Sequence, residues 1–295
     1  MIAVIVGVFA ASLFARTQLG DAPLESASDS PRRIVSMAPN LTETLFTLGL
    51  GERVVGVTRY CLHPPAAAER AKIGGHLDPN FEAVVTLRPD LVVLLREQAD
   101  LVDSFAKLGI PTLTVSDNGL PEIYTAIERI GTACGAPDRA QRLVDDMRCR
   151  VQRIEQRTAG RLRPRVLLVI DRTQGTGAIE DAYVVGSDAY MERLIHLAGG
   201  QNAYRGPAVA YPVVSAEGLI YLDPEVIIDF SAATGAMDNG GDHLADWQTM
   251  PELSAVREGR IYALRQQGIL LPGPRTVDLL GALAKRIHPA TASGG

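Results

Sequence analysis

The feature that most constrains the fold of this chain is an internal repeat. GGHLDPNFEAVVTLRPDLVVLL (74–95) and VVSAEGLIYLDPEVIIDF (213–230) each carry a Glu seven residues before a Pro, a Leu two residues before that Pro, and an acidic residue directly after it. A second pair, TETLFTLGLG (42–51) and MERLIHLAGG (191–200), matches at Glu, Leu, Leu and Gly with identical spacing. Two matches in the same order predict two similar lobes, because a solenoid would repeat every ~20–50 residues.

Each half of the chain alternates apolar runs with helical patterns. LVVLL (91–95) is apolar without alternation, as in a parallel strand that is covered on both faces. Other strands are expected at 33–37, 54–57 and 112–115 in the first half, and at 165–171 and 260–264 in the second. Helix starts are expected where Asn40 or Thr42, and Asp78 before Pro79, can cap free N–H groups. The alternation predicts an α/β fold with two three-layer lobes.

Residues 121–160 show helical spacing throughout, broken only by GAP at 135–137. A helix of ~20 residues spans about 30 Å, the width of a small domain. We therefore expect a long rigid backbone helix to join the lobes, with the ligand cleft between them.

The expected domain boundaries follow from these patterns. They are 1–19 for a signal peptide or N-terminal hydrophobic segment, 20–31 for a linker, 32–120 for the N-terminal α/β lobe, 121–163 for the backbone helices, 164–289 for the C-terminal α/β lobe, and 290–295 for a disordered tail. The uncharged run IAVIVGVFAASLFA (2–15) is shorter than the ~20 residues that span a bilayer and fits a signal-peptide core. It predicts export to the periplasm or another extracytoplasmic compartment.

Composition and motifs exclude several function classes. The net charge of −5 disfavours nucleic acid as a partner, and we expect a monomer without a cofactor. The chain lacks a nucleophile elbow, and GTG (175–177) is not a full phosphate loop, so an enzyme is disfavoured. A receptor for bare zinc or manganese would need three or four converging ligands, whereas only His76, Asp78 and Asp171 are suitably placed. Cys134 and Cys149 lie in helical patterns and are expected to be packing residues.

Several segments together resemble a known family. The chain is similar, over about residues 32–288, to periplasmic substrate-binding proteins of ABC importers for cobalamin, ferric siderophores or haem, of the helical-backbone type and with most likeness to the vitamin B12-binding members. The segments that carry the resemblance are RIVSMAPNLTETLFTLGLGERVVGVT, HPP (63–65), GGHLDPNFEAVVTLRPDLVV, YVVGSDAYMERLIHLAGGQN, VSAEGLIYLDPEVII and PGPR with its following helix. The resemblance implies a small metal-chelate ligand, held between two lobes and passed to a membrane permease.

The resemblance gives Glu82 and Glu217 a role. They match the paired glutamates with which such proteins dock onto arginines of the permease. Each is expected in the first turn of a helix, where the helix dipole favours a carboxylate. A glutamate at a helix start is also common on any soluble protein, so this alternative stays open.

Ligand contacts are expected where the strands end, since ligands of open α/β sheets bind beyond the carboxyl ends of the strands. The candidates are Tyr60, His76, Arg59, Arg96, Arg172 and Tyr211. The resemblance places an aromatic contact at Tyr211, and it has an aromatic residue where this chain has His76.

The candidate side chains leave the ligand open. An imidazole or a tyrosine can stack on a flat ring or ligate haem iron, and arginines can bind carboxylates or phosphates through two parallel hydrogen bonds. Solvated surface side chains are the alternative for each candidate. The resemblance ranks cobalamin first, a ferric siderophore second and haem third.

Overall fold

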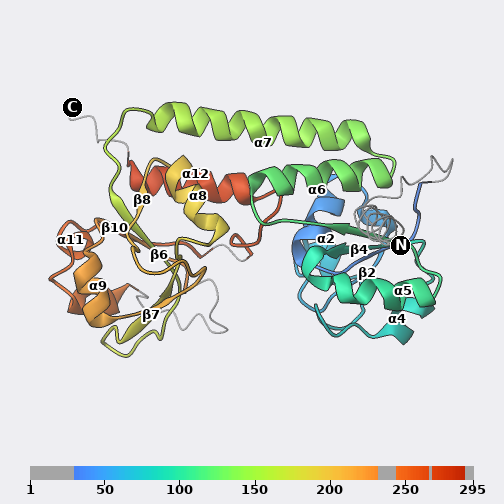
Figure 1. Ribbon diagram of the computed structural model, residues 1–295, viewed down its shortest axis with the longest axis horizontal. Coiled ribbons are helices and arrows are strands. Elements are labelled where there is room, and N and C mark those ends of the chain that lie inside the picture. Colours follow the sequence, from blue (N-terminus) through green and yellow to red (C-terminus); the bar gives the residue numbers. More distant parts are fainter. Residues whose placement is uncertain (1–29, 232–243, 266–267, 290–295) are drawn as a thin grey trace, which may run out of the picture.

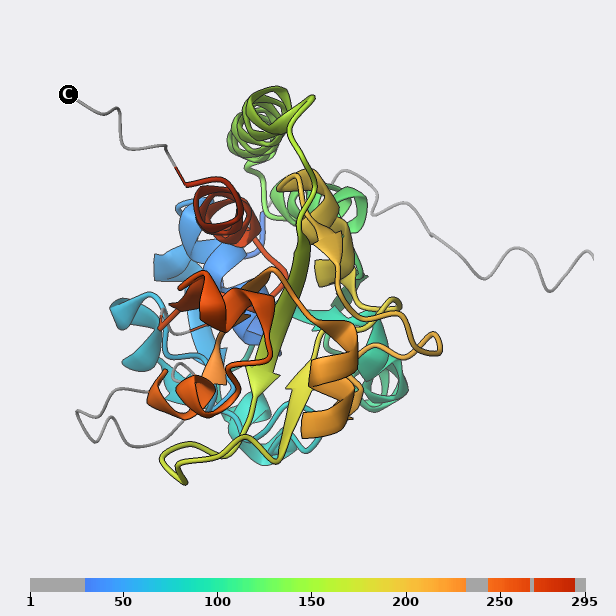
Figure 2. The ribbon, with the colours of Figure 1, turned by 90° about the vertical axis from the view of Figure 1, so that its left-hand side faces the viewer.

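The computed structural model describes residues 30–231, 244–265 and 268–289. The helices and strands form two α/β lobes that lie side by side, with a layer of long helices along one edge of both (Figures 1 and 2). The expected signal segment, most of the linker and the tail lie outside the described residues. Among those residues, none of the helices has the length and apolar composition to cross a membrane.

Lobe one is built on a five-stranded, fully parallel sheet in the order β3-β2-β1-β4-β5. Its strands are β1 (Ile34–Ser36), β2 (Val54–Val57), β3 (Ala71–Lys72), β4 (Leu91–Leu95) and β5 (Thr112–Val115). Its helices are α2 (Pro39–Thr47), α3 (Pro65–Ala68), α4 (Phe81–Thr86) and α5 (Val102–Lys107), and 3-10 turns lie at Gly51–Arg53 and Arg96–Leu101. The expected strand-helix alternation is confirmed.

Lobe two is built on a mixed sheet in the order β11-β10-β6-β7-β9, with β8 paired to β6. β6 (Arg165–Asp171), β8 (Gln201–Asn202), β10 (Val226–Asp229) and β11 (Ile261–Ala263) run parallel, whereas β7 (Asp181–Val184) is antiparallel to β6 and to β9 (Val213–Ser215). Its helices are α8 (Tyr190–Leu197), α9 (Ala216–Leu222), α11 (Ser254–Arg257) and α12 (Thr276–Ile287), with a 3-10 turn at Ala245–Thr249.

Two helices connect the lobes. α6 (Leu120–Ala133) and α7 (Pro137–Thr158) pack against each other, and α7 also packs against α8 and α12 of lobe two. α7 forms the outer edge of the molecule in Figure 1. The expected helical backbone is therefore present as two helices, joined by a turn in which Gly135 takes the left-handed conformation at φ +69°.

The largest apolar core runs through both lobes and the backbone helices. Alternate residues of the central strands divide between this core and a smaller core on the other face of each sheet. On β4, Leu91, Val93 and Leu95 face the shared core, while Val92 and Leu94 face the smaller core of lobe one. On β6, Val166 and Leu168 face the shared core, while Leu167 and Val169 face the smaller core of lobe two.

The sequence repeat corresponds to a repeated structural unit. α4 and α9 are capped by the side chains of Asn80 and Ser215, each of which accepts a hydrogen bond from the N–H group three residues later. Asp78 does not cap α4, contrary to the expectation, because the helix begins three residues after it. Neither Asn40 nor Thr42 caps α2, since both lie inside that helix, which begins at a proline.

The turn after each of these two helices is also repeated. Arg88 (φ +45°) and Asp223 (φ +39°) precede the two prolines, and they are the non-glycine residues with positive φ in the described part of the chain. The carboxylate after each proline then accepts a backbone N–H bond at the start of the central strand. Asp90 accepts from Arg33, and Glu225 accepts from Arg165. The turn thus fixes the register of helix, turn and strand in both lobes.

The three cysteines are free thiols. Cys61 and Cys134 are buried, and burial raises the pKa of the Cys134 thiol to about 12. Cys149 is exposed on α7, so the expectation that it is a packing residue is wrong.

The two left-handed turns generate a pair of opposite predictions. Arg88→Gly should raise the free energy of unfolding by about 0.5 kcal/mol, because glycine relieves left-handed strain but adds entropy to the unfolded chain. Asp223→Gly should lower it by about 1–2 kcal/mol, because Asp223 accepts hydrogen bonds from Ser254 N at 2.7 Å and Ser254 Oγ at 2.9 Å. Urea unfolding of both variants checks this; a gain from Asp223→Gly would contradict it.

Candidate ligand-binding site

Lobe one gathers polar side chains at the carboxyl ends of its strands. His76 Nε2 lies 2.6 Å from Glu97 Oε1, and His76 Nδ1 lies 3.2 Å from the carbonyl oxygen of Met37. The buried Gln98 side chain donates to the His76 and Met37 carbonyls. The His76 imidazole is therefore held by residues that follow β1 and β4, and it is partly exposed. A ligand that bound this ring would have to displace Glu97.

Asp117, two residues after β5, joins this network to lobe two. Asn40 Nδ2 donates to Asp117 Oδ2 at 2.7 Å and to the Pro272 carbonyl at 2.8 Å. Burial raises the pKa of Asp117, and the charge of Glu97 raises it further. One amide group thus bridges a carboxylate of lobe one and the chain that leads into α12.

A buried ion pair makes a second link between the lobes. Arg275, directly before α12, donates from Nε to Glu43 Oε2 on α2 at 2.8 Å, and its Nη2 contacts Glu43 Oε1 as well. Such forked, charge-assisted bonds are strong and directional. Glu192, the residue that matches Glu43 in the repeat, instead lies 3.6 Å from His196 on its own helix. The repeat therefore keeps the helix and changes the role of its glutamate.

Lobe two places two tyrosines at the same boundary. Tyr190 at the start of α8 donates its hydroxyl to the Leu270 carbonyl at 2.5 Å. Burial raises the pKa of Tyr190, and the charges of Tyr211 and Asp117 raise it further. Tyr211 is 45% exposed, and burial of the rest raises its pKa. Tyr211 therefore offers a half-exposed ring, whereas Tyr190 is largely packed and its hydroxyl is engaged.

A cavity of about 470 Å³ opens at this boundary. Lobe one contributes Asn118, and lobe two contributes Tyr190 with neighbours from the start and exposed face of α8. These neighbours are Ser187, Asp188, Ala189, Glu192, Arg193 and His196. Asn118 and the residues of α8 thus line one hollow, and none of the ligand contacts expected from the sequence lines it.

The remaining candidates in lobe one lie beyond β2 and β4. Arg59 Nη2 pairs with Asp78 at 3.0 Å, and its guanidinium lies 5.7 Å from the centre of the exposed Tyr60 ring. Arg96 is exposed at the start of the 3-10 turn after β4. The structure brings Arg59 and Tyr60 together, and it places His76 in the separate Glu97 network.

The assignment of Arg172 as a ligand contact must be corrected. Its side chain has no exposed surface and pairs with Asp229 at 2.7 Å and Asp246 at 2.9 Å inside lobe two. Trp247 donates from its indole nitrogen to the same Asp229 carboxylate. Arg172 is thus a structural group of lobe two and not a ligand contact, because its charge is already neutralised by two buried carboxylates.

The glycine-rich loop after β6 serves the same buried cluster. Gly175 and Gly177 donate their N–H groups to the Asp246 carboxylate at 2.8 and 2.9 Å. Burial alone would raise the pKa of Asp246, but these bonds and Arg172 lower it overall. The loop therefore binds a carboxylate of its own chain.

Sequence reasoning missed three groups of this site. Asp117 lies two residues after β5 and was recoverable from the rule that binding residues follow strands. Glu97 follows β4 in the same way. Tyr190 has no comparable signal, because its place at the boundary depends on how α8 packs against α7 and α12.

The chain matches the family model described as "Periplasmic binding protein" over residues 34–267. It is 30% identical over 252 residues to the vitamin B12-binding protein of Vibrio cholerae, covering 83% of this chain and 85% of the relative. It is 29% identical over 266 residues to an uncharacterized ABC transporter substrate-binding lipoprotein of Bacillus subtilis, covering 88% of this chain and 81% of the relative.

Two solved structures are similar throughout. The periplasmic vitamin B12-binding protein BtuF of Vibrio cholerae aligns with a TM-score of 0.71 and 26% identity, covering 88% of this chain and 97% of BtuF. The periplasmic heme-binding protein BhuT, in complex with two hemes, aligns with a TM-score of 0.73 and 26% identity, covering 88% of this chain and 98% of BhuT.

The buried Asp117 carboxyl generates a pH prediction. Its pKa is raised above 3.8 in the folded chain, so the folded state holds this proton more tightly than the unfolded state, and Asp117 makes folding less favourable as the pH rises through that raised pKa. Asp117→Asn keeps an acceptor for Asn40 and removes this cost. Its free energy of unfolding, relative to the parent, should therefore grow from pH 4 to pH 7. Urea unfolding across this range checks it, and a constant difference would contradict it.

Proposed function

The chain belongs to the periplasmic binding protein family as a substrate-binding component of an ABC importer, and on that premise we propose that it captures cobalamin between its lobes and delivers it to the membrane permease. The proposal includes export, with residues 2–15 as the signal core. It excludes catalysis, in keeping with relatives that are binding proteins.

The observation that carries the cobalamin proposal is the pairing of flat aromatic faces with polar groups at the interlobe boundary. Tyr211 offers a half-exposed ring on lobe two. On lobe one, Asn40, Asp117 and His76 are polar groups beyond the strand ends, and the amides of a ligand would replace their present protein partners. A corrin ring edged with amides needs both kinds of contact. Relatives in Vibrio cholerae that are vitamin B12-binding proteins support the same choice.

Haem is the second candidate. Tyr60 is exposed and His76 is partly exposed, and either side chain can ligate haem iron. The likeness to a structure that holds two hemes supports this alternative. His76 would first have to leave Glu97, whereas Tyr60 needs no such exchange, so Tyr60 is the better axial ligand. A ferric siderophore would draw on Arg59 and Arg96, which lie at the strand ends of lobe one.

The docking surface is proposed to be α4 and α9. Glu82 and Glu217 are each the second residue of their helix and are exposed. Three residues later, Val85 and Ile220 are 45% and 43% exposed, on the same helix face as the glutamates. Each lobe thus presents one carboxylate beside one apolar side chain. Two equivalent contact points fit a partner that offers two equivalent arginine-bearing sites, since complementary charges guide association.

The ligand prediction is tested by titrating purified protein with cyanocobalamin, haemin and ferric siderophores, with absorbance and calorimetry as the measurements. Cyanocobalamin should bind saturably at one site. Tyr211→Ala should weaken this binding about tenfold by removing a stacking face, and Tyr221→Ala, which alters an almost fully exposed tyrosine of α9, should leave it within twofold. Binding of haemin alone, with a spectrum changed by Tyr60→Phe, would overturn the choice of cobalamin.

The docking prediction uses charge reversal. Glu82→Arg with Glu217→Arg should abolish uptake of labelled ligand in cells that carry the cognate importer, while the purified variant keeps its ligand affinity. Glu122→Arg with Glu252→Arg is the matched control, because both glutamates are exposed and Glu122 also lies in the first turn of a helix. Equal uptake by the two variants would contradict docking through α4 and α9.

A further inference from the structure

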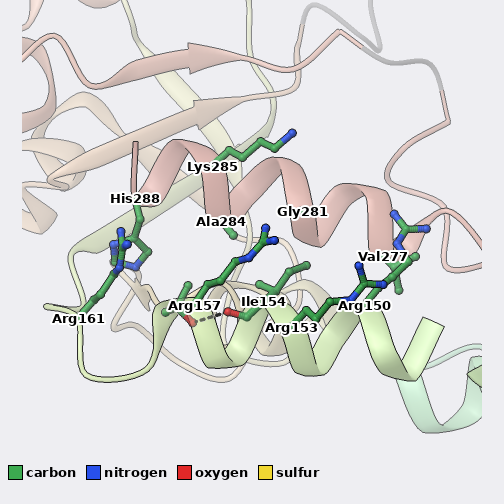
Figure 3. A pocket seen from close by; sticks show the side chains of 11 residues that line it. Arg150, Arg153, Ile154, Arg157, Arg161, Val277, Gly281, Ala284, Lys285 and His288 are labelled. Carbon is green, nitrogen blue, oxygen red and sulfur yellow. Dashed lines mark hydrogen bonds between the residues drawn. The ribbon is translucent and has the colours of Figure 1, made fainter. Parts of the chain in front are cut away.

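A second cavity lies in the backbone layer, away from the interlobe boundary. It has a volume of about 600 Å³ and opens between α7 and α12, as Figure 3 shows. α7 and the residue after its turn contribute Arg150, Arg153, Ile154, Arg157, Thr158 and Arg161; α12 and the residue after it contribute Val277, Gly281, Ala284, Lys285 and His288. We call this cavity the spine groove.

The arginines of the spine groove form a stripe along one helix face. Arg150, Arg153 and Arg157 follow one another at steps of three and four residues, the spacing that stacks side chains on a single side of a helix, and Arg161 lies three residues beyond the end of α7. Figure 3 shows this row of guanidinium groups along α7, with Lys285 on α12. From Arg150 to Arg157 the row extends over about 10 Å at 1.5 Å per residue.

Most of these charges have no acidic partner. Arg150 pairs with Asp278 at one end of the groove. Within residues 30–231, 244–265 and 268–289, no salt bridge engages Arg153, Arg157, Arg161 or Lys285. Glu155, the one acidic residue between positions 148 and 165, does not line the groove. Like charges one helix turn apart destabilise a helix, so the stripe is costly unless something neutralises it.

The pKa of His288, at the end of the groove, is also affected by nearby positive charges. Burial lowers its pKa, and the charges of Arg161, Arg260 and Arg163 lower it further, although its bond to the Gly199 carbonyl acts in the opposite direction. This concentration of positive charge lies in a chain whose net charge is −5. The charge is therefore a local feature of the groove and does not reflect the overall composition.

We propose that the spine groove binds an extended anion with several phosphoryl groups in a row. Arginine forks hold phosphate oxygens through paired hydrogen bonds, and a row of three arginines about 10 Å long, with Arg161 beyond it, suits several linked groups better than one. The floor of Ile154, Val277 and Ala284 offers no competing acceptor side chain. The arginines line a recess between two helices, which admits a narrow chain of phosphates more readily than a flat layer of lipid headgroups.

The test is calorimetric titration of the full protein with tripolyphosphate at 150 mM salt. We expect saturable binding at one site, at least tenfold tighter than binding of inorganic phosphate. Arg153→Gln with Arg157→Gln should weaken it at least tenfold. Arg142→Gln with Lys107→Gln is the matched control, because it removes two exposed positive charges outside the groove. The affinity of this control for tripolyphosphate should stay within twofold of the parent. Circular dichroism melts establish that both variants fold.

Three outcomes would overturn the proposal. Equal loss of binding in both variants would mean that only net charge matters. Equal affinity for citrate would mean that the groove does not select phosphoryl groups. Tighter association with vesicles of anionic phospholipid than with tripolyphosphate would assign the arginines to a membrane surface. None of these outcomes bears on ligand capture between the lobes, because the groove shares no lining residue with that site.

Discussion

The rest of the structure depends on one apolar core that both lobes share. Each central strand is buried on both faces, and one of those faces packs into the common core that includes α6, α7 and α12. Burial of apolar surface is the main favourable term in folding. Because the backbone helices complete the core of each sheet, neither lobe can expose that face to solvent without losing much of its stability.

Polar contacts then set how the two lobes face each other. The Glu43–Arg275 pair and the Asn40 bridge to Asp117 and Pro272 both join α2 to the chain just before α12. Removing one partner of a buried ion pair is strongly destabilising, because the other charge is left without compensation. These contacts therefore hold the lobes in the orientation that the structure shows.

The sequence was sufficient for the architecture and less so for the site. Most strand positions, the backbone helices and the repeated helix-turn-strand unit could be predicted, because they depend on local periodicity and on spacing within one segment. The short strands β3, β8 and β9 could not. Arg172 could not be interpreted in this way, since its carboxylate partners lie 57 and 74 residues further along the chain. The Asp78 cap failed for a local reason, because Asn80 offers a competing cap closer to the apolar face of α4. The site assignments of Tyr60, His76, Arg59, Arg96 and Tyr211 stay predictions.

The position of α7 has a mechanical consequence. α4 and α9 lie at the ends of the lobes away from α7 (Figure 1). A rotation of one lobe about the long axis of α7 would displace each point in proportion to its distance from that axis. The interlobe site and the tips with Glu82 and Glu217 would then move by different amounts, with the larger travel at the tips. If the lobes rotate in this way around a ligand, a small adjustment at the site becomes a larger change in the spacing of two distant carboxylates.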